Sequence, residues 1–283
     1  QQGAKWEGIP LDYWKFHGGH MVDKPGEIKV FESAVRFVKT AFERKSKSPS
    51  RWSHTDLYPE FTIWDYKVKT NKSEPGYISI TNADKGGFGL YQSKWLPDGP
   101  PLNTGSVQVI TASIYRPGKK YNVVSYVKKT GQVSENIQQA DKDGRLSFLY
   151  DQQGIETGIY DENDGASFIV LDHTTGNNNR FLYNGQKGLL ALKLFNRGNT
   201  SLPAGKISVL LSSTDAAGHF STNKVEVNLR TGQRIIGLPP FSIVCNKILP
   251  QHAEPPQLNI IVTIQYGKNS IKDSVTVPVL YAS

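Results

Sequence analysis

The chain has 283 residues, of which 37% are hydrophobic and 20% charged, a composition that excludes an intrinsically disordered or membrane-embedded protein. No apolar run approaches the roughly 20 residues that span a bilayer, so the sequence predicts no membrane span. The formal net charge is +8, and residues 178–283 account for most of it, with eleven Lys/Arg against four Asp/Glu.

Residues 1–50 contain the helix that the sequence predicts. Pro25-Gly26-Glu27 provides a start signal, and apolar side chains recur at helical spacing through residues 28–43. Because the apolar stripe is broad, we expect this helix to pack against a large surface. Residues 44–50 are rich in Lys, Arg and Ser, which is typical of an exposed linker.

Residues 51–177 predict a first β-sandwich module. Short strand-like runs alternate with Gly, Pro and Asp turn residues at intervals of roughly 8–12 residues, the pattern of an antiparallel sandwich. The runs that we expect to form strands are 61–68, 77–81, 88–95, 107–115, 121–127, 146–150 and 168–171.

Residues 178–283 predict a second, basic module of the same kind. A strand, the turn Phe195-Asn196-Arg197-Gly198-Asn199 and the apolar run 205–213 resemble immunoglobulin-like accessory modules of bacterial exported proteins. The expected fold class is therefore mainly β, with two tandem antiparallel β-sandwich modules behind a short β-loop-α segment. The expected strands are 189–195, 207–211, 225–229, 235–236, 243–245, 258–266 and 275–280.

The sharpest local motif is the segment 13–23, in which an aromatic run leads into His17-Gly18-Gly19-His20. Together with the following helix it resembles the closing β-loop-α unit of an α/β-hydrolase, where glycines let the loop turn tightly toward the nucleophile. The resemblance implies that His20 is the catalytic general base, with His17 as second choice. Two other interpretations stay open: a plain exposed turn, and a metal-binding pair formed by the two histidines.

The rest of the hydrolase pattern is missing from this sequence. There is no G-x-S-x-G motif, since Ser106 and Ser167 lie near glycines without it. The resemblance therefore implies that the nucleophile lies on a missing N-terminal part, which would be the partner of this chain.

Aromatic residues of the first module offer a candidate binding surface. Trp64, Tyr66, Tyr91 and Trp95 are able to stack on a sugar, or they form the core of the sandwich. Trp95 stands beside a double-proline loop and is the one that we most expect to be exposed.

Two acidic turns contain the oxygen ligands that calcium prefers. They are Asp141-Lys142-Asp143-Gly144 and Asp161-Glu162-Asn163-Asp164, and neither has the full EF-hand pattern. Hairpin turns use the same residues for backbone reasons, so both interpretations stay open. No other cofactor is predicted.

Cys245 and the basic residues of the last module both have ordinary explanations. The single cysteine excludes an intrachain disulfide, and its apolar neighbours favour a buried, inert thiol. The basic excess indicates either a solvated surface or an acidic partner such as a polyanionic glycan, and no nucleic-acid-binding motif accompanies it. The scattered basic residues are Lys187, Lys193, Arg197, Lys206, Lys224, Arg230, Arg234 and Lys247.

Two functions are compatible with this sequence. The first is the C-terminal part of an exported bacterial serine hydrolase, secreted, periplasmic or on the cell surface, that contributes His20 and accessory β modules. The second is a non-catalytic carbohydrate- or protein-binding β-sandwich protein, in which the 28–43 helix packs on the first module.

Overall fold

The computed structural model divides into two compact units, the first ending at Asp161 and the second starting at Glu162. Both are built from β-strands, and no α-helix occurs in the described part of the chain, which confirms the mainly-β prediction. No helix able to cross a membrane is found there either. The predicted helix 28–43 and the whole β-loop-α segment lie outside the described residues. The described residues are 51–71, 76–94, 99–102, 105–151, 154–176, 179–201, 204–213, 218–246 and 257–280.

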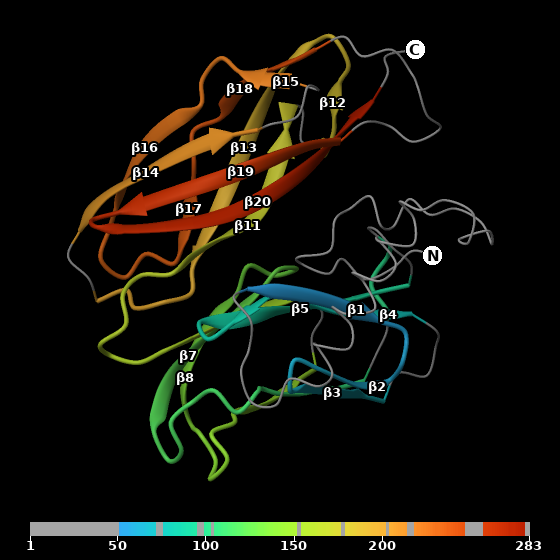
Figure 1. Cartoon of the computed structure of the whole chain (residues 1–283), viewed down its shortest axis with the longest axis vertical. Coiled ribbons are helices and arrows are strands. Elements are labelled where there is room, and N and C mark those ends of the chain that lie inside the picture. Colours follow the sequence, from blue (N-terminus) through green and yellow to red (C-terminus); the bar gives the residue numbers. More distant parts are fainter. Residues whose placement is uncertain are drawn as a thin grey trace, which may run out of the picture. The chain divides into compact units, whose positions relative to one another are not determined.

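The first unit consists of two antiparallel sheets (Figure 1). One has six strands in the order β1-β4-β5-β10-β7-β8, and the other has four in the order β2-β3-β6-β9. The strands are β1 (Trp52–Asp56), β2 (Glu60–Ile63), β3 (Tyr66–Thr70), β4 (Tyr77–Asp84), β5 (Gly87–Ser93), β6 (Val107–Ile110), β7 (Lys120–Val127), β8 (Val133–Gln139), β9 (Ser147–Tyr150) and β10 (Ile155–Tyr160).

The two sheets of the first unit share one hydrophobic core. In β2 and β3 every second side chain is buried, as expected for strands with one face on a core. Phe88 of the six-stranded sheet and Phe148 of the four-stranded sheet meet edge to face, with ring centroids 5.4 Å apart. Tyr66 packs on Phe88 in the same way at 6.2 Å, so inward-pointing aromatic rings join the two layers of the sandwich.

The run 61–68, expected to be one strand, is a hairpin of β2 and β3. Its turn consists of Trp64 and Asp65, which have φ values of 48° and 65°. Two consecutive residues at positive φ are characteristic of the two-residue hairpin turn whose twist matches that of the flanking strands. The alternating aromatic residues predicted one continuous strand here, because Trp64 is not a typical turn residue.

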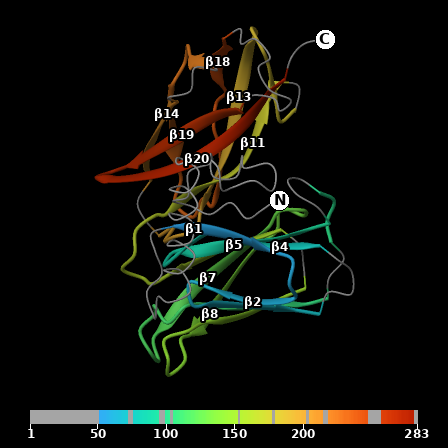
Figure 2. The ribbon, with the colours of Figure 1, turned by 45° about the vertical axis from the view of Figure 1, so that its right-hand side comes forward.

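The second unit also consists of two sheets (Figure 2). One has the order β11-β13-β18-β15 with β17 paired to β13, and the other has the order β12-β20-β19-β14-β16. The strands are β11 (Phe168–Thr175), β12 (Leu182–Tyr183), β13 (Lys187–Asn196), β14 (Gly205–Ser212), β15 (Gly218–Phe220), β16 (Lys224–Leu229), β17 (Ile235–Gly237), β18 (Phe241–Cys245), β19 (Gln257–Tyr266) and β20 (Asn269–Leu280).

The pairing in the second unit is consistent with an immunoglobulin-like sandwich. β11 pairs with β13 in one sheet, whereas β12 runs parallel to the last strand, β20, in the other. Apolar side chains of both sheets, among them Leu194, Phe241, Val209 and Ile260, belong to one core cluster. The long hairpin of β19 and β20 alternates buried and exposed residues along β19, as a strand half-covered by such a core should.

The boundary between the units differs from the sequence expectation. Residues 168–171 were assigned to the module ending at 177, but they begin β11, which pairs with β13 of the second unit. The units divide at Asp161/Glu162 instead. The acidic turn after β10 therefore separates the units, a role that turn chemistry alone does not reveal.

Candidate functional site

Of the histidines and aromatic residues that the sequence offered as sites, the structure describes Trp64, Tyr66 and Tyr91. His17, His20 and Trp95 lie outside the described residues. Trp64 is 6% exposed and belongs to the core of the first unit, the alternative that the sequence had left open. Tyr91 lies on β5 and is half-buried.

Tyr91 donates a hydrogen bond to the carboxylate of Glu156 on the neighbouring strand β10. Glu156 is only 2% exposed. Gly89 lies directly opposite Glu156, and a Cβ atom there would approach both carboxylate oxygens to 2.8 Å. The glycine therefore provides the space in which a buried carboxylate lies against the sheet, and Glu156 is a residue that sequence reasoning missed.

The surroundings of Glu156 belong to the sheet face directed away from the core of the first unit. Tyr126 lies opposite Glu156 on β7 and is 7% exposed, although it is not part of the core cluster. The ammonium of Lys128 stands 5.3 Å from the centre of the Tyr91 ring, within the range of a cation–π contact. The Tyr91 hydroxyl thus stabilises a buried carboxylate, and one face of its ring is occupied by a cation.

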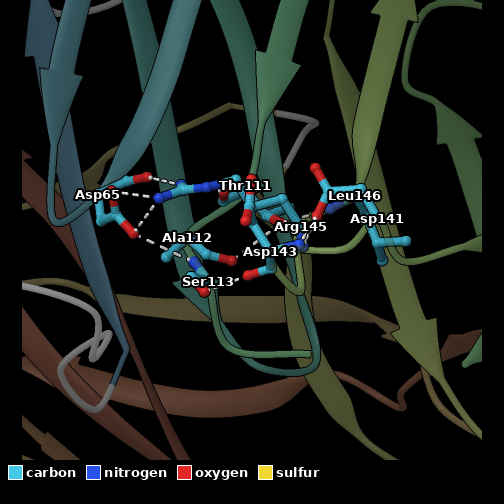
Figure 3. A network of polar contacts seen from close by, with 8 residues as sticks. All are labelled: Asp65, Thr111, Ala112, Ser113, Asp141, Asp143, Arg145 and Leu146. Carbon is cyan, nitrogen blue, oxygen red and sulfur yellow. Dashed lines mark hydrogen bonds and ion pairs between the residues drawn. The ribbon is translucent and has the colours of Figure 1, made fainter. Parts of the chain in front are cut away.

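A second polar network ties together three loops of the first unit, as Figure 3 shows. Arg145 donates from Nη1 to the backbone oxygens of Asp65 and Thr111, each at 2.9 Å. Its Nη2 donates to both carboxylate oxygens of Asp65 at 2.8 and 2.7 Å. Asp65 also accepts a hydrogen bond from the backbone of Ser113 at 3.2 Å. The network fixes the positive-φ turn of the β2–β3 hairpin to the loops that follow β6 and β8.

An aspartate of the first acidic turn binds the turn's own backbone, and an aspartate of the second forms an ion pair. Asp141 accepts hydrogen bonds from the backbone N–H groups of Asp143 and Arg145, at 2.9 and 2.8 Å, as in a side-chain-capped turn. Asp161 forms an ion pair with Lys119 at 2.5 Å. Within the described ranges no group of three or more His, Cys, Asp or Glu side chains is placed to hold a metal ion.

His54 and Asp56 form a histidine–carboxylate pair that sequence reasoning did not identify. Alternate residues of a strand point to the same side, which brings Nε2 of His54 within 3.1 Å of the Asp56 carboxylate. The imidazole also packs at 5.3 Å from the Phe61 ring. Burial lowers the pKa of His54, while the hydrogen bond and charge of Asp56 partly oppose that shift. The His54 ring therefore connects the middle of β1 to Phe61 of β2.

Several basic residues of the second unit are buried or paired with a carboxylate. Arg197 and Arg234 are buried, at 1% and 6% exposure. Lys206 and Lys224 both pair with Glu226, at 2.9 and 3.1 Å. Arg234 donates hydrogen bonds to the backbone oxygens of the turn after β13, so at least part of the basic excess has a structural use.

Cys245 is the residue that the sequence predicted to be inert. Its side chain is 2% exposed and lies in the core of the second unit. Burial raises the pKa of the thiol, which reduces its thiolate fraction at neutral pH. This environment supports the structural interpretation.

Comparisons with known proteins show no matching family model and no matching curated protein. Among solved structures, the chain is similar to the β-glucuronidase of Parabacteroides merdae, with TM-score 0.33 and 12% identity over 62% of this chain and 27% of that one. It is also similar to Escherichia coli alpha-2-macroglobulin activated by porcine elastase, with TM-score 0.27 and 12% identity over 83% of this chain and 30% of that one.

A further similar structure is the tetra-tandem repeat in the extending region of a large adhesion protein, with TM-score 0.19 and 11% identity over 84% of this chain and 72% of that one. The chain spans less than a third of the length of the glucuronidase and the macroglobulin. TM-scores this low support no conclusion about the fold or the activity of this chain.

Proposed function

We propose that residues 51–280 form two non-catalytic accessory β-sandwich modules of an exported bacterial serine hydrolase that acts on a carboxylic or glycan ester. In this proposal residues 1–50 close the hydrolase-type domain and His20 is its catalytic histidine. The serine nucleophile lies in sequence N-terminal to Gln1. The resemblance of the 13–23 segment to the hydrolase β-loop-α unit supports the hydrolase part.

One observation supports the non-catalytic assignment: several titratable side chains of the first unit are engaged in contacts that hold loops and strands in place. Arg145 binds Asp65 across two loops at 2.7 Å, and Lys119 binds Asp161 at 2.5 Å. His54 lies in the wall of the core beside Phe61. Catalytic groups instead need an approachable position next to a reacting atom.

The experiment is ester hydrolysis by the longer gene product that includes the residues encoded before Gln1. We expect turnover of p-nitrophenyl acetate, and a loss of at least about 100-fold in kcat with His20→Ala, since general base catalysis contributes that much. The matched control is His219→Ala, because His219 is exposed on β15 of the second unit. Equal activity of the two variants would exclude His20 as the catalytic histidine.

Carbohydrate binding by the first unit is a second candidate, and the position of Tyr91 favours it. Its ring is half-buried on a sheet face and its hydroxyl is held by Glu156, so one ring position is fixed without a ligand. Rigid aromatic rings of this kind stack on sugars. Affinity electrophoresis of the full chain in gels containing soluble polysaccharides tests it: retardation must disappear with Tyr91→Ala and persist with Tyr58→Ala, whose ring is 71% exposed on a loop.

A further inference from the structure

β8 is the terminal strand of the six-stranded sheet and pairs on one side with β7. Six of its seven residues are exposed, and Ile137 is 66% exposed. The strand contains no Lys, Pro or Gly and its register with β7 has no bulge. Lysine, proline and bulges usually prevent an edge strand from pairing with another chain, and β8 lacks all three. The edge strand β16, in contrast, carries Lys224.

The parity of the β7–β8 ladder identifies the backbone groups that face outward. Val127 donates to the oxygen of Gln132 at 2.9 Å at one end, and Ala140 donates to the oxygen of Lys119 at 2.9 Å at the other. Because ladder bonds alternate along an antiparallel pair, both ends require that residues 134, 136 and 138 bond to β7. The backbone N–H and C=O groups of residues 133, 135, 137 and 139 then point away from β7.

This outward row is complementary to itself. In an antiparallel pair of two β8 strands centred on Asn136, residue 135 lies opposite residue 137 of the copy, and residue 133 lies opposite residue 139. Each of these is a pair in which both residues direct N–H and C=O toward the partner. Glu135 faces Ile137 of the copy, so the strand's one charged side chain does not lie directly opposite its own copy.

We propose that two copies of this chain associate through β8, antiparallel and with Asn136 on the two-fold axis, so that their six-stranded sheets become continuous. This inference goes beyond the proposed function and does not depend on it. A C2 contact of this kind is closed and self-limiting. Because one strand of seven residues contributes a small area, the dimer belongs with weak interfaces rather than obligate ones.

Disulfide trapping in the full chain tests the register. In the proposed pair, the two residues 136 form a non-hydrogen-bonded pair with Cα atoms about 4.5 Å apart, within the range that a disulfide bridges. We expect Asn136→Cys to give a covalent dimer in a glutathione redox buffer. Ser134→Cys and Gln138→Cys should each stay monomeric alone, since residue 134 faces residue 138, and should link when mixed. The native Cys245 is buried and present in every variant.

The control for random collision is Leu149→Cys, because Leu149 is 72% exposed on the edge strand of the other sheet. Asn136→Cys must link at least tenfold faster than Leu149→Cys. Sedimentation equilibrium gives the second readout: the average mass of the unmodified chain should rise with concentration, and Ile137→Lys should abolish the rise while Leu149→Lys preserves it. Equal linking rates at positions 136 and 149, or equal linking by Ser134→Cys alone, would overturn the proposal.

Discussion

The guanidinium of Arg145 and the carboxylate of Asp65 lie 2.7 Å apart although 80 residues separate them in the sequence. Both side chains are about one-fifth exposed, so water weakens their attraction only partly. The same guanidinium also satisfies two backbone oxygens, one of them in a turn at positive φ. Arg145 therefore links the β2–β3 turn to the loops that follow β6 and β8.

Replacement of Arg145 by alanine should lower the free energy of unfolding of the first unit by roughly 2–3 kcal/mol, because it leaves a partly buried carboxylate and two backbone oxygens without their donor. Arg145→Lys should recover only part of the loss, since an ammonium lacks the planar set of donors. Urea denaturation followed by tryptophan fluorescence measures this. Arg180→Ala is the control, because Arg180 is 52% exposed in its pair with Asp172 and its loss should change stability by less than about 0.5 kcal/mol.

Gly144 and Gly131 form a matched pair for separating steric collision from backbone strain. Both have φ of 73°, but a Cβ at Gly144 would collide with the carbonyl oxygen of Tyr115, whereas a Cβ at Gly131 meets nothing within 4 Å. Gly131→Ala should cost about 1–2 kcal/mol from the left-handed conformation alone. Gly144→Ala should cost at least about 1 kcal/mol more, measured as the difference in urea midpoints at constant slope. Equal losses of stability in the two variants would mean that the loop around Tyr115 moves to accommodate the added Cβ without cost.

His54 should make the stability of the first unit depend on pH below neutrality. Its folded pKa lies below the ordinary value of 6.5, with burial as the main cause, so the unfolded chain binds more protons as the pH falls. His54 therefore does not lower the free energy of unfolding above about pH 7. It lowers that free energy progressively as the pH decreases below 6.5. Urea unfolding at pH 8, 6.5 and 5 should show a steeper decline for the native chain than for His54→Gln. If the stability of the two chains declined equally with pH, His54 would not be the cause of the pH dependence.

Cys245 should resist thiol reagents in the folded state. Burial both blocks access to the sulfur and raises its pKa, which lowers the thiolate concentration. We expect Ellman's reagent to modify less than about a tenth of the thiol per hour in the native chain at pH 7.5, and all of it within minutes in 6 M guanidinium chloride. Rapid native labelling would place this sulfur at an accessible surface.

The sequence predicted the strands of the second unit well because their apolar residues alternate or form short runs, as in 258–266 within β19. It did not predict the turn at Trp64-Asp65, because a positive φ is held there by tertiary contacts from Arg145 rather than by local turn residues. Glu156 was not predicted as a site residue either. Its burial depends on Gly89 and Tyr91 of the adjacent strand, a pairing that the one-dimensional pattern does not contain.

Labelling with a fluorophosphonate probe tests the central claim, that the two β-sandwich units contain no catalytic nucleophile. The 283-residue chain is incubated with the probe at neutral pH and its intact mass is measured, with chymotrypsin as the positive control. No adduct is expected on any residue from 51 to 280. A stoichiometric adduct on a serine of either unit, lost after heat denaturation, would contradict it and show that these units perform the chemistry themselves.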